Sequence, residues 1–202
     1  MLKEIAKHTI DFYPFELSYA WKNDLNWKPR STLQSLSMHQ YFDQKTADYF
    51  SSKEAPDYLL WHMSSKTHGT KYDFETTDGR YLFTDDPATV TSILRSYSPL
   101  KEENGNFILK KQKRNVLELD STYTYSDVFD LKDWVNVPER QNCITTASIS
   151  IKEKGSRKIK RFLFKDEIYW IHFITDQNEE IKHRVSTSFI KNKIWVNVYF
   201  AY

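Results

Sequence analysis

The chain has 202 residues, of which 40% are hydrophobic and 16% aromatic, and this is ample for a packed core. Lysine and arginine total 29 against 27 acidic residues, and the balance is the same in both halves of the chain. A nucleic-acid-binding domain usually carries a concentrated basic surface, so we expect no nucleic-acid partner. Cys143 is the only cysteine, which excludes an intrachain disulfide and a zinc site built on several thiolates. No apolar run approaches the roughly 20 residues that cross a bilayer.

Helix and strand signals alternate from the N-terminus to about residue 115. Leu2, Ile5 and Ala6 share one face of a predicted helix, and an apolar strand over residues 10–13 follows and ends at Pro14. The spacing of Phe42, Thr46, Tyr49 and Phe50 predicts a second helix. A buried strand over residues 58–63 follows the break at Pro56.

The next helix has the clearest start. Asp86 is a good N-cap residue, and Pro87 at the first helical position loses no hydrogen bond. Val90, Ile93, Leu94 and Tyr97 form its apolar stripe, and a strand over residues 107–109 follows Gly105. This order predicts an α/β domain over residues 1–115, with a short sheet in which parallel pairing is possible.

Strand signals dominate after residue 115. The candidate strands lie at residues 144–151, 158–164, 168–175, 181–188 and 194–200. Ile181, His183 and Val185 alternate with polar residues, as in a strand with one buried face, whereas residues 168–174 are apolar on both faces and predict a covered central strand. We therefore expect an all-β, sandwich-like domain over residues 116–202.

Several short segments stand in a characteristic order along the chain. They are TIDFYP at 9–14, WKPRSTLQS at 27–35, APDYLLW at 55–61, DGRY at 78–81 and PATV at 87–90, with a later tyrosine at 97. In this order they resemble the C-terminal extramembrane region of large multi-pass bacterial membrane proteins described as glycosyltransferase-like or uncharacterised. The resemblance implies a membrane-embedded portion upstream of Met1 and places the chemistry of the family in that portion.

Asp11 is the first candidate site residue, because a carboxylate inside an apolar strand is costly unless it is paired, hydrogen-bonded or used. Arg30 is its expected partner. A functional interpretation places Asp11, Arg30 and Gln34 in a ligand cleft near strand ends, whereas a structural interpretation has them tie a loop to the sheet. Structural ion pairs outnumber catalytic ones, so the structural interpretation is favoured.

Asp78 and Arg80 are further candidate ligand-binding residues, although Asp-Gly-Arg is first of all typical of a turn that opens a strand. His62 and His68 do not match a standard metal-binding spacing, so no metal site is predicted. The sequence has no phosphate-binding glycine loop, no nucleophile elbow and no paired catalytic carboxylates. We therefore predict no cofactor and no enzymatic activity for this chain alone.

Trp134 is the tryptophan expected to be exposed, because charged residues precede it and Pro138 follows; the other five are expected to be mostly core. Exposed aromatic side chains can stack on pyranose rings. A basic hairpin over residues 152–165 could face an anionic membrane, or could be a solvated hairpin that discourages edge pairing.

The resemblance, together with the lack of catalytic motifs, implies a non-catalytic extracytoplasmic domain that binds or positions a glycan or a lipid-linked sugar beside the membrane-embedded portion of the same protein. The alternative is a free-standing, cytoplasmic interaction protein of a bacterium without sugar chemistry. The sequence leaves both open.

Overall fold

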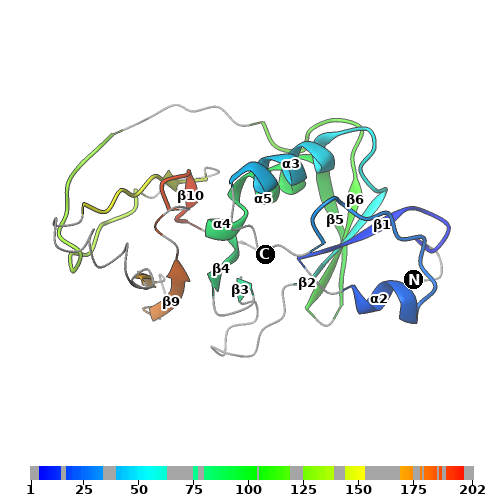
Figure 1. Cartoon of the computed structure of the whole chain (residues 1–202), viewed down its shortest axis with the longest axis horizontal. Coiled ribbons are helices and arrows are strands. Elements are labelled where there is room, and N and C mark those ends of the chain that lie inside the picture. Colours follow the sequence, from blue (N-terminus) through cyan, green and yellow to red (C-terminus); the bar gives the residue numbers. More distant parts are fainter. Residues whose placement is uncertain are drawn as a thin grey trace, which may run out of the picture.

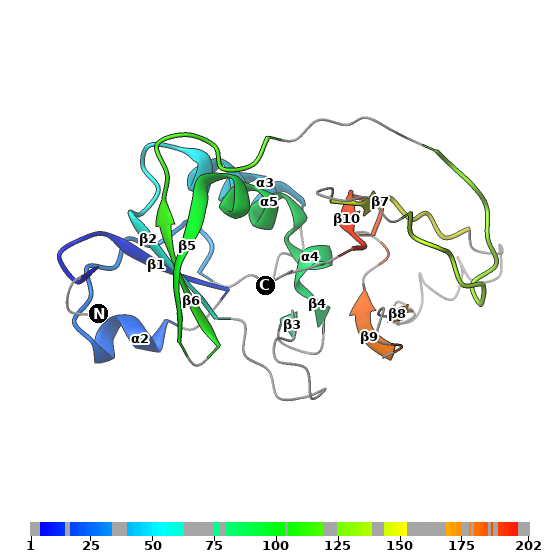
Figure 2. The same ribbon diagram turned by 180° about the vertical axis from the view of Figure 1, so that it is seen from behind.

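The computed structural model describes residues 5–14, 17–33, 40–62, 75–76, 80–103, 105–118, 125–138, 144–152, 169–174, 178, 180–185, 187 and 190–197. They form an α/β protein with mixed sheets (Figure 1). The larger sheet and the helices that cover it lie at one end of the molecule, the strands after residue 144 lie at the other end, and residues 80–85 lie between them (Figures 1 and 2).

The larger sheet of the first half has the strand order β1-β2-β6-β5. Its strands are β1 (Ile10–Tyr13), β2 (Tyr58–His62), β5 (Tyr97–Glu103) and β6 (Asn106–Lys111). Only β1 and β2 run parallel, because β5 and β6 form a hairpin at Gly105 that pairs antiparallel to β2. A single bridge from Ile10 to Trp27 extends the sheet beyond β1.

Helices cover both faces of this sheet (Figure 1). α3 (Gln40–Ser51) and α5 (Pro87–Ser96) share a core with Leu59 and Leu109, whereas α2 (Ser18–Lys22) packs on the opposite face against Phe12 and Leu60. Adjacent strand residues therefore enter different cores, as the pleat requires.

The start of α5 differs in one respect from the prediction. Asp86 occupies the N-cap position, but its side chain caps no backbone N–H. Instead, the carboxylate of Asp43 in α3 accepts hydrogen bonds from the backbone N–H groups of Ala88 at 3.0 Å and Thr89 at 2.8 Å. The cap thus comes from a neighbouring helix, which joins α3 to α5, and the Asp86 carboxylate accepts from the Tyr13 hydroxyl at 3.4 Å.

The second half contributes strands to two further sheets. One has the order β3-β4-β9-β8, with β3 (Glu75–Thr76), β4 (Arg80–Tyr81), β8 (Tyr169–Ile174) and β9 (Glu180–Val185). The other pairs β7 (Thr146–Ala147) with β10 (Ile194–Trp195). The predicted strand over residues 144–151 is thus reduced to two residues, and the strand predicted over 158–164 lies outside the described residues.

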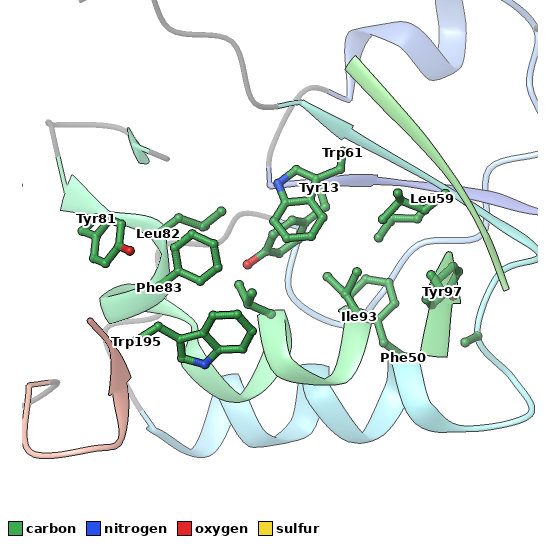
Figure 3. Close-up of a cluster of buried hydrophobic side chains, with 13 residues drawn as sticks. Tyr13, Phe50, Leu59, Trp61, Tyr81, Leu82, Phe83, Ile93, Tyr97 and Trp195 are labelled. Atoms are coloured by element: carbon green, nitrogen blue, oxygen red, sulfur yellow. The ribbon is translucent and has the colours of Figure 1, made fainter. Parts of the chain in front are cut away.

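The two halves share one hydrophobic core, shown in Figure 3. Phe83 of the short helix α4 (Leu82–Asp85) stacks on Trp195 at a ring distance of 5.2 Å, and Tyr81 stacks on His183 at 4.7 Å. β4 pairs with β9, so a strand of the first half belongs to a sheet of the second. The division at residue 115 remains a prediction, but direct packing between the halves is a feature of the fold.

Residues 125–138 lie in the connection between β6 and β7; they form no helix or strand, and all of them are exposed. They run along the end of the molecule remote from β1, drawn in yellow-green in Figures 1 and 2. Among the described residues after 115, no helix occurs.

Candidate functional site

Asp11 and Arg30 form the predicted ion pair. The Nη1 atom of Arg30 lies 3.0 Å from Oδ2 of Asp11, and both side chains are almost fully buried. The second carboxylate oxygen, Oδ1, accepts a hydrogen bond from the indole Nε1–H of Trp27 at 3.0 Å. The Asp11 carboxylate of β1 thus binds two side chains of the segment from Trp27 to Arg30.

Arg30 also donates to backbone carbonyls on both sides of the pair. Its guanidinium bonds the carbonyl oxygens of Phe12, Pro14 and Leu33. Nearby, the Tyr49 hydroxyl donates to the Lys28 carbonyl at 3.1 Å, and burial, reinforced by the charge of Asp11, raises the pKa of Tyr49 to about 12. These contacts are internal to the fold, so the geometry favours the structural interpretation of Asp11 and Arg30. Gln34, the third member of that predicted group, lies outside the described residues.

Three of the segments that carry the family resemblance, at residues 9–14, 27–35 and 55–61, meet at β1. Besides the Asp11–Arg30 pair, the Thr9 hydroxyl donates to the Asp57 carboxylate at 2.9 Å and accepts from the Asp57 backbone N–H at 2.9 Å. The rings of Tyr13 and Trp61 make an edge contact at 5.4 Å. Their common role in this structure is therefore to join β1, β2 and the loop that begins at Trp27.

A different surface has the exposure that a ligand needs. β8 was predicted to be covered on both faces, and this prediction is wrong: Trp170, His172 and Ile174 are exposed, whereas the alternate residues are half-buried. Trp170 is 50% exposed. β8 therefore has one partly covered face and one exposed face.

The neighbouring strands place charged residues beside this exposed face. Strand register aligns Trp170 with Arg184 of β9, and Arg184 in turn with Arg80 of β4. Lys182 lies opposite His172, and its Nζ atom is 5.9 Å from the centre of the Trp170 ring. Cross-strand partners share a face of the sheet, so these residues form a connected surface.

Trp134 joins the same surface from the connecting segment. It is 59% exposed, as predicted, and its ring makes an edge contact with the His172 imidazole at 6.5 Å. The Nδ1 atom of His172 lies 2.6 Å from Oε1 of Glu180. We call this surface the aromatic sheet face; its members are Trp134, Trp170, His172, Glu180, Lys182 and Arg184.

Two of the predicted site residues, Arg80 and Trp134, thus lie on or beside one sheet. Arg80 is half-buried and its Nη1 atom is 3.8 Å from Oδ2 of the buried Asp85, so part of its charge is balanced inside the protein. Asp78 lies outside the described residues. The sequence missed Trp170, Lys182 and Arg184; the outward positions of Lys182 and Arg184 in the alternating strand were the signal that could have identified them.

The aromatic sheet face offers groups that can contact a ligand. Exposed indole rings offer flat apolar surfaces, and the adjoining cations and carboxylate offer hydrogen bonds. No group of three or more histidine, cysteine or acidic side chains in the described part of the chain is arranged to hold a metal ion. His62, considered above as a metal ligand, instead contacts the Asn106 side chain at 2.8 Å, and His68 lies outside the described residues.

Comparisons with family models, with curated proteins and with solved structures found no match to this chain. Within the described residues, no helix is both long and apolar enough to cross a membrane. The relation to membrane glycosyltransferase-like proteins accordingly stays a prediction.

Proposed function

We propose that this protein is a non-catalytic, extracytoplasmic glycan-binding domain, and that the aromatic sheet face binds or positions a glycan or a lipid-linked sugar. The supporting observation is the exposure of Trp170 on β8 and of Trp134, whose ring contacts His172 of the same strand, beside polar and charged neighbours. Sugar rings present apolar C–H faces and hydroxyl edges, and this surface offers an indole plane beside hydrogen-bonding groups.

We also propose a fold for the second half and a partner for the domain. Residues 116–202 would complete a sandwich in which the covered faces of β8 and β9 look inward and the aromatic sheet face looks outward. The partner would be the membrane-embedded portion of the same protein, which the family resemblance implies. The buried Asp11–Arg30 pair would serve this function indirectly, by stabilising the fold that presents the sheet.

A glycan array tests the proposal. The wild-type chain should bind a subset of glycans, and Trp134→Ala and Trp170→Ala should each weaken that binding about tenfold, a loss of about 1.4 kcal/mol. Trp21→Ala is the matched control, because Trp21 is also exposed but lies on α2, where it contacts Trp27.

Two outcomes would count against the proposal. Binding that is unaffected by both substitutions would remove the aromatic sheet face from the site. Transfer or hydrolysis of any sugar donor by the isolated chain would contradict the non-catalytic assignment.

A further inference from the structure

The aromatic sheet face carries more cationic than acidic side chains. Its one carboxylate, Glu180, is engaged by His172 at 2.6 Å. Lys182 and Arg184 have no carboxylate partner among the described residues. Two cations of this surface are therefore available to a ligand, and both lie next to Trp170.

The strand geometry brings these two cations together. Lys182 and Arg184 are two residues apart on β9, so they project from the same face with Cα atoms roughly 6 to 7 Å apart. Arg184 is the cross-strand partner of Trp170, and Lys182 reaches over the Trp170 ring. A single anionic group bound at the edge of the indole could contact both side chains.

From this arrangement we infer that the ligand is an anionic sugar, whose ring stacks on Trp170 and whose phosphate or carboxylate group is bound by Lys182 and Arg184. This inference rests on the proposed glycan-binding function and narrows its ligand class. Guanidinium and ammonium groups bind such anions by charge-assisted hydrogen bonds, and Arg184 can offer two parallel donors.

The cation–π contact between Lys182 and Trp170 fits the same arrangement. In the absence of a ligand, the ammonium group of Lys182 lies over the Trp170 ring, next to the proposed anion site. The contact is between exposed groups and therefore weak, so an anion can draw Lys182 from the ring and leave the indole plane to the sugar.

An NMR titration of the full chain tests the inference with three probes: glucose 1-phosphate, methyl glucoside and inorganic phosphate. We expect glucose 1-phosphate to bind most tightly and to shift the indole signal of Trp170. Lys182→Gln and Arg184→Gln should each weaken its binding about three- to fivefold, as is typical of exposed charge pairs, and the effect should shrink at high salt. Lys45→Gln, a change of an exposed lysine on α3, is the control.

The possible results separate this inference from the proposed function. Equal binding of methyl glucoside and glucose 1-phosphate would overturn the anionic preference and leave glycan binding intact. Inorganic phosphate that binds as tightly as glucose 1-phosphate, with no effect of Trp170→Ala, would show a simple anion site and overturn both. A loss of glucose 1-phosphate binding in Trp170→Ala, Lys182→Gln and Arg184→Gln, but not in Lys45→Gln, would support both.

Discussion

Arg30 joins two segments of the first half of the fold. It neutralises the carboxylate inside β1 and bonds three backbone carbonyls in two segments. Arg30→Ala would leave Asp11 buried without its ionic partner, which commonly costs about 3 to 5 kcal/mol. We expect a fall of this size in the free energy of unfolding, measured by urea denaturation.

Lys28→Ala is the matched control for this prediction. Lys28 lies in the same loop, and its ion pair with Glu54 is exposed, so its removal should cost at most about 1 kcal/mol. Equal stability losses in the two variants would contradict the structural role of Arg30.

We expect Asp43 and Asp57 to change the pH dependence of stability in opposite directions. Burial raises the pKa of Asp43 above its ordinary value of 3.8, against the hydrogen bonds from Thr89 and Ala88. Burial of Asp57 acts in the same direction, but hydrogen bonds from Thr9 and the nearby charges of His8 and Lys28 outweigh it and lower the pKa of Asp57. The contribution of Asp43 to stability is therefore fully present below pH 3.8 and lost as pH rises through its folded-state pKa. The contribution of Asp57 is present above pH 3.8 and lost as pH falls through its folded-state pKa.

Unfolding of wild type, Asp43→Asn and Asp57→Asn between about pH 2 and pH 6 measures both effects. As pH rises, the stability of wild type should fall relative to Asp43→Asn and rise relative to Asp57→Asn. Differences of the same sign for the two variants would contradict the assigned environments.

At the scale of elements, the two halves contact each other through the pairing of β4 with β9 and through the stacked rings of Phe83 and Trp195. The connecting residues 125–138 make no helix or strand and are exposed. A site-specific protease sequence substituted for residues 127–133 should therefore be cleaved in the native protein. Both fragments should then elute together in size-exclusion chromatography, because the shared core persists; separate elution would show that the halves are held only by the chain.

The periodic spacing of apolar residues predicted those helices and strands whose pattern lies within one continuous stretch of sequence. The apolar run before Pro14 predicted β1, and the spacing that begins at Pro87 predicted α5. The pairing of β4 with β9 joins residues about a hundred positions apart, and no local period encodes such a contact. The cap that Asp43 gives to α5 was missed for the same reason.

Among candidate site residues, the sequence identified those with local chemical signals. Asp11 was found because a carboxylate inside an apolar strand requires a partner, and Trp134 because charged residues precede it and a proline follows. Trp170 was assigned to the core because its strand is apolar on both faces, and only the three-dimensional arrangement leaves one of those faces uncovered. Exposure is a property of what packs above a strand, which the strand's own sequence does not determine.

At the scale of the whole molecule, the α/β half and the shared core support a sheet whose exposed face carries Trp170, with Trp134 packed beside it from the connecting segment. In the proposed function, this face binds a glycan. The six tryptophan indole N–H groups provide built-in probes, because they are spread over the whole structure.

The most direct measurement is a ¹H–¹⁵N NMR titration with the strongest ligand from the glycan array, following all six indole signals assigned by single substitution. We predict that the signals of Trp134 and Trp170 shift together with one dissociation constant, while those of Trp21 and the buried Trp61 stay in place. Shifts at Trp21 without shifts at Trp134 and Trp170 would contradict the claim and move the binding site away from the aromatic sheet face.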